Sequence, residues 1–184
     1  SATIGLGGGS GTLNLDDTEL AFLQDGFSSI TIGDTTSGTG AVNISSSTFT
    51  DTLTIVGGSI SVTELNATGE QVSLIARTGA ITDGGSGGTD IIASSLRASA
   101  VTGIASTGNV LETQVSTLAA ATSTSGDIAL LNTGAIDITT VDTVAGLTGS
   151  SGGGVVQLNA DNAITVSQPI TVSGVGTVAL HAQG

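Results

Sequence analysis

The chain has no cysteine, lysine, methionine, tryptophan or tyrosine among its 184 residues. Without cysteine it cannot have a disulfide scaffold. Two arginines against fifteen carboxylates give a net charge of −13, and this excludes the clustered basic surface that nucleic-acid binding requires. The apolar runs are only a few residues long, far short of the ~20 residues that a membrane-spanning helix needs. We therefore expect no nucleic-acid partner and no insertion into a membrane.

Aromatic residues are also scarce, at 2% of the chain, whereas glycine is abundant, at 29 residues. The mean hydropathy is positive, at +0.42, and β-branched residues are frequent, which argues against intrinsic disorder. A core without aromatic rings has to be built from thin layers of valine, isoleucine, leucine and alanine. This composition favours stacked β-structure over a compact globule.

One short pattern recurs along the chain: an apolar residue, any residue, and a second apolar residue at the start of a predicted strand. Val101 occupies the place of a further copy. The near-regular spacing predicts a repeat of roughly 28 residues, within the range of stacked repeat proteins, although a competing copy at Gly108–Val110 leaves a shorter repeat open. The pattern occurs at Leu13–Leu15, Val42–Ile44, Val72–Leu74, Ile128–Leu130, Val156–Leu158 and Val178–Leu180.

Two further apolar segments with period-2 alternation follow the pattern within each repeat. The clearest case is Val156–Val166, which aligns without gaps on Ile128–Ile138. Because a single coil cannot bury its inward residues alone, such repeats stack. The sequence predicts an all-β fold: a parallel, three-sided β-solenoid of six to seven coils that spans residues 1–184 as one segment.

Equivalent positions of stacked coils lie above one another. We therefore expect one column of core residues from the repeated pattern: Leu13, Val42, Val72, Val101, Ile128, Val156 and Val178. Gly84–Asp90 and Gly146–Gly154 are expected to be turn segments that project from corners, and residues 113–122 are expected to be strand or loop rather than helix. Pro169 is expected at a corner.

Both ends of the sequence read as parts of coils, at Ala2–Leu6 and Val178–Gly184. Repeat proteins need polar terminal units to cover the core, and neither end has one. We expect the solenoid to be uncapped and to pair end to end, with neighbouring coils or with other subunits.

Metal and cofactor sites are not predicted. The tract Gly84–Ile92 resembles a calcium-binding nonapeptide, but Asp90 stands one residue late and no tandem copy follows. Asp16, Asp17 and Glu19 read as a solvated acidic rim, on which calcium would bind only adventitiously.

Catalytic residues are not predicted either, and we expect that the chain is not an enzyme. A carbohydrate-active β-helix would need paired carboxylates and aromatic rings for the sugar. Arg77 and Arg97 are assigned to outward positions of the third coil, and His181 has no partner. Asn43 and Asn66 are the first residues of N-x-S/T sequences, the acceptor pattern for N-glycosylation. Asn66, which is expected near a turn, is the better acceptor of the two.

Three segments carry a resemblance to a known family: Gly69–Ala76, Gly126–Asn132 and Gly154–Ile164. Each is similar to the G-x-[VI]-x-L-x-A…A-I-x-[VI] phrase of filamentous-haemagglutinin-like exoproteins of bacteria. The resemblance implies a right-handed β-helical shaft, an extracellular or cell-surface location, adhesive or matrix roles, and host or bacterial surface glycans as partners. The coil predicted for this chain is longer than is usual in that family.

The sequence thus favours a structural shaft of an extracellular bacterial adhesin or fibre, which would serve adhesion or a biofilm matrix. A self-assembling filament subunit that stacks end to end is the first alternative. A carbohydrate-active β-helix enzyme is the second.

Overall fold

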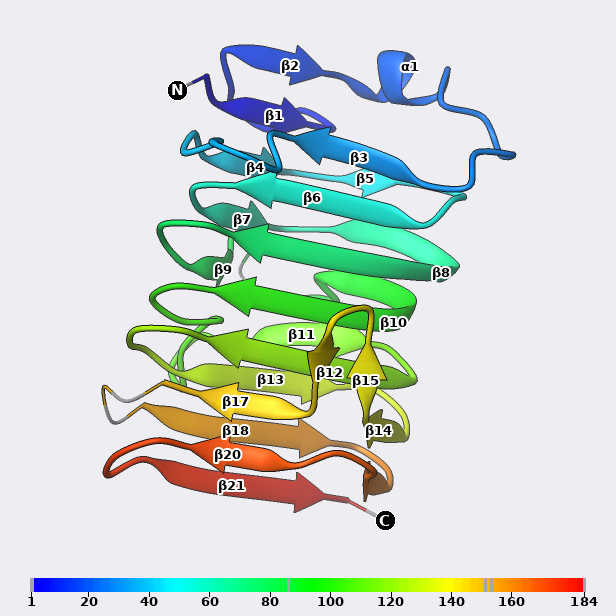
Figure 1. The fold of residues 1–184 in the computed structure, drawn as a ribbon. Helices are drawn as coiled ribbons and strands as arrows, with labels where there is room; N and C mark the ends of the chain where they lie inside the picture. The colour runs from blue at the N-terminus through cyan, green and yellow to red at the C-terminus, as the bar shows by residue number, and fades with distance from the viewer. Residues whose placement is uncertain (1, 86, 151, 153, 184) are drawn as a thin grey trace.

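The structure is a computed structural model that describes residues 2–85, 87–150, 152 and 154–183. It is a parallel β-solenoid of about seven turns, as predicted. Figure 1 shows the strands stacked from the N-terminal end to the C-terminal end, with the two termini at opposite ends of the stack. The described part contains a single short helix, α1 (Asp17–Leu20).

Two broad faces enclose the core, and a short side joins them. One face, called the β4 face, contains β1 (Ile4–Leu6), β4 (Val42–Ile44), β7 (Ile60–Val62), β9 (Ile81–Asp83), β13 (Ile128–Asn132), β18 (Val155–Ala160) and β21 (Thr177–Ala182). The opposite face, called the β6 face, contains β3 (Ile30–Gly33), β6 (Leu53–Gly57), β12 (Thr117–Thr122), β14 (Ile136–Ile138), β17 (Leu147–Gly149), β19 (Ile164–Val166) and β20 (Ile170–Val172).

The short side contains β5 (Ser47–Thr48), β11 (Leu111–Gln114) and the first halves of two long strands, β8 (Leu65–Ala76) and β10 (Ile91–Ala100), whose second halves continue onto the β6 face. Within β8 the chain turns the corner at Gly69, which has φ +88°, a backbone conformation that glycine adopts without strain. The coil of residues 60–76 therefore has three strand segments, as predicted.

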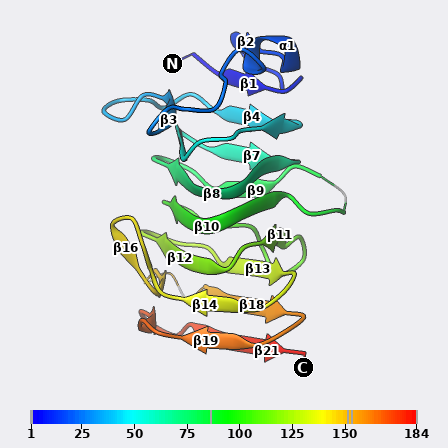
Figure 2. The ribbon, with the colours of Figure 1, turned by 90° about the vertical axis from the view of Figure 1, so that its right-hand side faces the viewer.

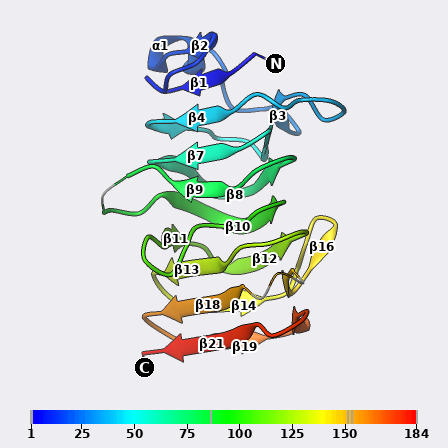
Figure 3. The same cartoon turned by 90° about the vertical axis from the view of Figure 1, so that its left-hand side faces the viewer.

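Two elements lie outside this scheme. The strand β2 (Leu13–Leu15) pairs in parallel with β1 at the N-terminal end of the stack. The strands β15 (Thr140–Val141) and β16 (Val144–Ala145) form an antiparallel hairpin, which projects from the stack in Figures 2 and 3.

Inward side chains form columns that run along the axis. On the β6 face, Leu53, Val72, Leu96 and Leu118 pair in register and are fully buried. Each buried aliphatic side chain of this size contributes about 1.5–3 kcal/mol. The backbone hydrogen bonds between coils run along the same axis. The columns and the hydrogen-bond ladders therefore both hold successive coils together.

The coil length varies along the stack, unlike the single value that was predicted. On the β4 face the column runs through Val42, Ile60, Ile81, Ile104, Ile128, Val156 and Val178. The step from Val42 to Ile60 is the shortest, and the step from Ile128 to Val156 is the longest. Only this longest step has the predicted length. Its alignment on Val156–Val166 is confirmed by the pairing of β13 with β18 and of β14 with β19.

Two members of the predicted column were assigned wrongly. Val72 lies on the β6 face, between Leu53 and Leu96, and Val101 lies in the turn after β10. The apolar–x–apolar pattern occurs on both faces of each coil. The near-regular spacing therefore led us to assign copies from opposite faces to a single column. The other members of the predicted column do align, and Leu13 joins it through Ile4.

The two expected turn segments have different outcomes. The loop at Gly84–Asp90 is confirmed for its described residues. The segment Gly146–Gly154 is not a projecting turn throughout, because β17 lies within it, pairs with β12 and β20, and buries Leu147 completely. Its residues 151 and 153 lie outside the described part. The hairpin of β15 and β16 is the insertion that projects here.

Smaller expectations are met. The segment of residues 113–122 forms strand β12 and part of β11, Ala2–Leu6 contributes β1, and Pro169 stands between β19 and β20. The helix α1 was not predicted. Among the described residues, none of the helices has the length and apolar character to cross a bilayer.

Candidate functional site

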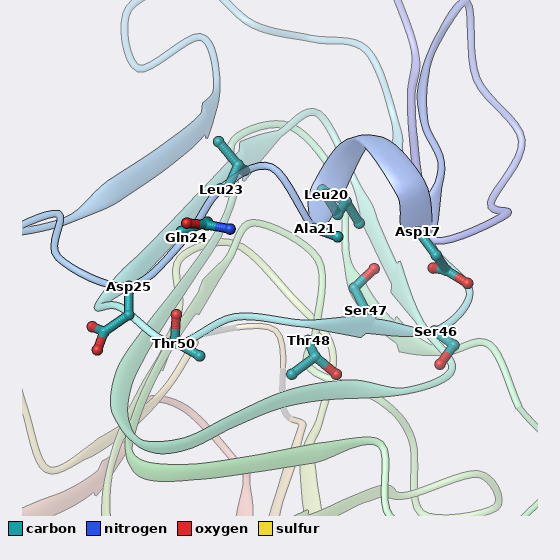
Figure 4. A pocket seen from close by; sticks show the side chains of 10 residues that line it. All are labelled: Asp17, Leu20, Ala21, Leu23, Gln24, Asp25, Ser46, Ser47, Thr48 and Thr50. Atoms are coloured by element: carbon teal, nitrogen blue, oxygen red, sulfur yellow. The ribbon is translucent and has the colours of Figure 1, made fainter.

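A groove opens beside the N-terminal coils, between α1 with the segment that follows it and the strand β5 (Figure 4). The sequence forms α1 through a capping box: the Asp16 side chain accepts from the Glu19 amide at 2.9 Å, and the Glu19 carboxylate accepts from the Asp16 amide at 3.0 Å. Leu20 then turns into the core, where it is 5% exposed. The helix is therefore held against the stack and forms one wall of the groove.

The groove has a volume of about 530 Å³ and a mixed lining. The lining combines two carboxylates and apolar side chains of α1 and the segment that follows it with the hydroxyls of β5 (Figure 4). The Ser47 hydroxyl is buried and has no hydrogen-bond partner among the described residues. The lining residues are Asp17, Leu20, Ala21, Leu23, Gln24, Asp25, Ser46, Ser47, Thr48 and Thr50.

The groove can accept hydrogen bonds from a neutral, hydroxyl-rich molecule or from a cationic one, and its charge disfavours anions. None of its lining residues is a histidine, cysteine or arginine. The segment that leaves α1 carries two exposed aromatic rings, Phe22 at 78% and Phe27 at 52%. It is anchored by Gly26, whose amide donates to Asp51 at 3.1 Å.

The acidic residues of this region do not form the predicted rim as a unit. Asp16 and Glu19 are occupied by the capping box, and Asp17 lines the groove. The signal for α1 was present in the sequence, because an aspartate followed three residues later by a glutamate is the pattern of a helix start.

The three basic or titratable side chains singled out in the sequence lie far apart. Arg77 donates to the carbonyls of Thr35 and Thr36, at 2.7 and 2.8 Å, and so ties down the loop after β3. Arg97 forms an ion pair with Asp142 of the projecting hairpin. His181 lies on β21, exposed, at the C-terminal end of the stack.

The loop after β3 also contains an exposed carboxylate, that of Asp34, whose pKa is shifted by local hydrogen bonds. Hydrogen bonds from Ser37 and Thr36 keep the pKa of Asp34 below its ordinary value. The two asparagines of the glycosylation triplets both lie in strands: Asn43 in β4, and Asn66 in β8 rather than in a turn. The Asn66 side-chain oxygen accepts from the Thr68 amide and hydroxyl.

A cluster of three carboxylates lies beside the β9–β10 loop, which projects from the side of the stack opposite to the hairpin (Figure 2). Asp83 ends β9, Asp90 ends the glycine-rich loop that follows, and Glu112 lies on β11. One oxygen of each lies within 4.8 Å of the others. Figures 2 and 3 show the loop between β9 and β10 projecting above β11. The sequence analysis noticed Asp90 but not the cluster, because Glu112 is brought to it only by the stacking of coils.

Asp90 is the most strongly perturbed group of the cluster. Its side chain is 2% exposed. Burial raises the pKa of Asp90 to about 8, and a hydrogen bond with the Glu112 side chain and the repulsion of the Asp83 and Glu112 carboxylates add to this effect. The Glu112 amide, which donates to Asp90 at 2.8 Å, acts in the opposite direction.

This shift predicts that the protein loses stability as the pH rises. Between the ordinary value of 3.8 and about 8 the folded state binds more protons than the unfolded state, so unfolding becomes easier with increasing pH. Between pH 5 and 8, in a chelator, we expect a loss on the order of 4 kcal/mol, or ~8–16 °C in Tm. Thermal melts of Asp90→Asn should show a flat profile over this range; a profile as steep as the wild type's would contradict the assignment.

No family model, curated protein or solved structure matches the chain. The resemblance to filamentous-haemagglutinin-like exoproteins therefore rests on the quoted repeat segments and on the solenoid fold, which is compatible with a β-helical shaft.

Proposed function

We propose that the chain is part of the rigid shaft of an extracellular bacterial adhesin or fibre. The observation that carries this proposal is the continuity of the stack: parallel pairing joins successive coils from β1 to β21, through single bridges at Ile104 on the β4 face, and buried aliphatic columns run through the coils between the two ends. In this arrangement a force along the axis is shared by the hydrogen bonds between successive coils.

The surface chemistry supports the same role. The net charge of −13 repels neighbouring shafts and limits lateral association. The absence of cysteine and methionine removes the side chains that oxidise most readily. We also propose that the chain is not an enzyme, because the lining of the groove contains neither histidine nor cysteine and the lone histidine lies at the other end of the stack.

A second candidate, a filament subunit that stacks end to end, is favoured by the terminal strands. In the described part β21 pairs only with β18, and β2 only with β1. Their apolar side chains are half exposed: Leu13 at 50% and Val178 at 46%. We propose that these edges pair with further coils, either of the same polypeptide or of a second copy.

One experiment tests the shaft and separates it from the subunit. An antibody raised against the folded solenoid would be applied to intact source cells and to a denaturing gel of the same cells. Surface labelling with a band far above 17.6 kDa supports the shaft. Surface labelling with a band near 17.6 kDa, and filaments in negative stain, supports the subunit. Labelling only after the cells are lysed contradicts both.

If the shaft also contacts glycans, the groove is where we propose that they bind. Its hydroxyls and carboxylates provide hydrogen bonds to sugar hydroxyls. Phe22 does not line the groove but follows the lining residue Ala21 in the chain, and its exposed ring offers a surface on which a sugar can stack. A glycan array would then show binding that Phe22→Ala weakens and that an exposed substitution on the opposite end, Val175→Ala, leaves unchanged. Equal binding by both variants would remove the groove from the proposal.

A further inference from the structure

We propose that Asp83, Asp90 and Glu112 bind one calcium ion between the β9–β10 loop and β11. Asp83 and Asp90 belong to one coil and Glu112 to the next, and the stacking of these two coils brings Glu112 to the pair. Each offers a carboxylate oxygen, and these oxygens lie within 4.8 Å of one another. Carboxylates are the ligands that hard divalent cations prefer in proteins.

Two carboxylate oxygens of the cluster have no hydrogen-bond donor among the described residues. The side chain of Asp90 is only 2% exposed, and the hydrogen bond from the Glu112 amide ends on Oδ2. Its Oδ1 faces the same side as Asp83 Oδ1, since both lie within 4 Å of where a Cβ of Gly85 would stand. Glu112 Oε2 is also buried without a partner. A buried oxygen of this kind is costly unless a proton or a cation satisfies it.

The chain has no cationic side chain to compensate the cluster. It contains no lysine, and its two arginines are engaged elsewhere, Arg77 with the loop after β3 and Arg97 with Asp142. His181 lies on β21 at the C-terminal end of the stack. The compensating charge therefore has to come from solution.

The loop favours calcium over magnesium, because magnesium demands near-ideal octahedral geometry and calcium does not. The loop contains Gly87 and Gly88 at positive φ, so its backbone can adapt to the irregular coordination that calcium accepts. An ion held here would tie the loop to β11 of the following coil.

Calorimetric titration of the EDTA-treated protein with CaCl₂ tests the proposal, with thermal melts as the second readout. We expect one equivalent to bind at or below ~1 mM, the weak limit for extracellular calcium modules, and the Tm to rise with calcium. Asp90→Asn and Glu112→Gln should each lower the affinity at least tenfold. The matched control is Glu64→Gln, which removes one exposed carboxylate outside the cluster and should bind like the wild type.

The melts also show whether a variant is folded. Asp90→Asn is nearly isosteric and keeps an oxygen that can accept from the Glu112 amide, so in EDTA it should melt close to the wild-type Tm while losing the response to calcium. Glu112→Gln provides the same test if Asp90→Asn fails to fold. The proposal is overturned if calcium binds without saturation, as an adventitious ion on an acidic surface, or if the cluster variants bind like the control. Equal binding of MgCl₂ would overturn the assignment of calcium.

Discussion

Replacing Leu96 with alanine should lower the free energy of unfolding by about 2–5 kcal/mol. Leu96 is fully buried on the β6 face and pairs with Val72 in the preceding coil and with Leu118 in the following one. Alanine would leave a cavity in a column that cannot close, because the backbone ladders hold the coils at a fixed spacing.

Urea unfolding followed by circular dichroism measures this loss. The matched control is Leu131→Ala, the same substitution at a leucine of β13 that is 37% exposed, for which we expect less than about 1 kcal/mol. Similar losses for the two variants would show that Leu96 is not part of a close-packed column.

Replacing Asn132 with alanine should cost about 2–4 kcal/mol, because it leaves several buried polar groups without partners. Asn132 is fully buried on β13. Its Oδ1 accepts from the Val115 amide and from the Thr113 hydroxyl, both at 3.0 Å, and its Nδ2 donates to the Val115 carbonyl at 3.2 Å. The side chain thus satisfies the backbone where two coils fail to pair directly.

Amide hydrogen exchange gives a local readout of the same substitution. In Asn132→Ala the Val115 amide should exchange at least tenfold faster, since its acceptor is gone. Asn14→Ala, at an exposed asparagine of β2, should change neither stability nor the exchange of Val115. An unchanged Val115 amide in Asn132→Ala would mean that the asparagine does not hold this turn.

The architecture could be predicted because its signal is repeated in every coil. Period-2 alternation, glycine at corners and the absence of long helical patterns all indicate stacked strands. Where the strands of two consecutive coils align without gaps, as at Ile128 and Val156, the register could be predicted residue by residue.

The register of the N-terminal half could not be predicted because each coil presents the same chemistry twice. An inward leucine of the β6 face and an inward isoleucine of the β4 face look alike in the sequence, and the unequal lengths of the coils make their spacing irregular. Val72 was assigned to the wrong face for this reason.

The buried polar residues could not be predicted from the sequence for a different reason. Asn132 reads as an ordinary outward residue at a strand end, and only the missing backbone partner at Val115 explains its burial. Asp83, Asp90 and Glu112 are unevenly spaced in the sequence, and they become one cluster only when the coil lengths are known. The groove beside α1 likewise depends on a helix of a single turn, which produces no periodic signal.

The distance between two spin labels along the axis tests the stacked, rigid shaft most directly. The chain has no cysteine, so Ser61→Cys and Ala179→Cys provide the only attachment points. The two positions occupy one outward column of the β4 face, five coil steps apart. At the ordinary strand spacing this predicts a single narrow distance of ~24 Å. A broad distribution, or a mean distance that corresponds to another number of steps, would contradict the stacked register.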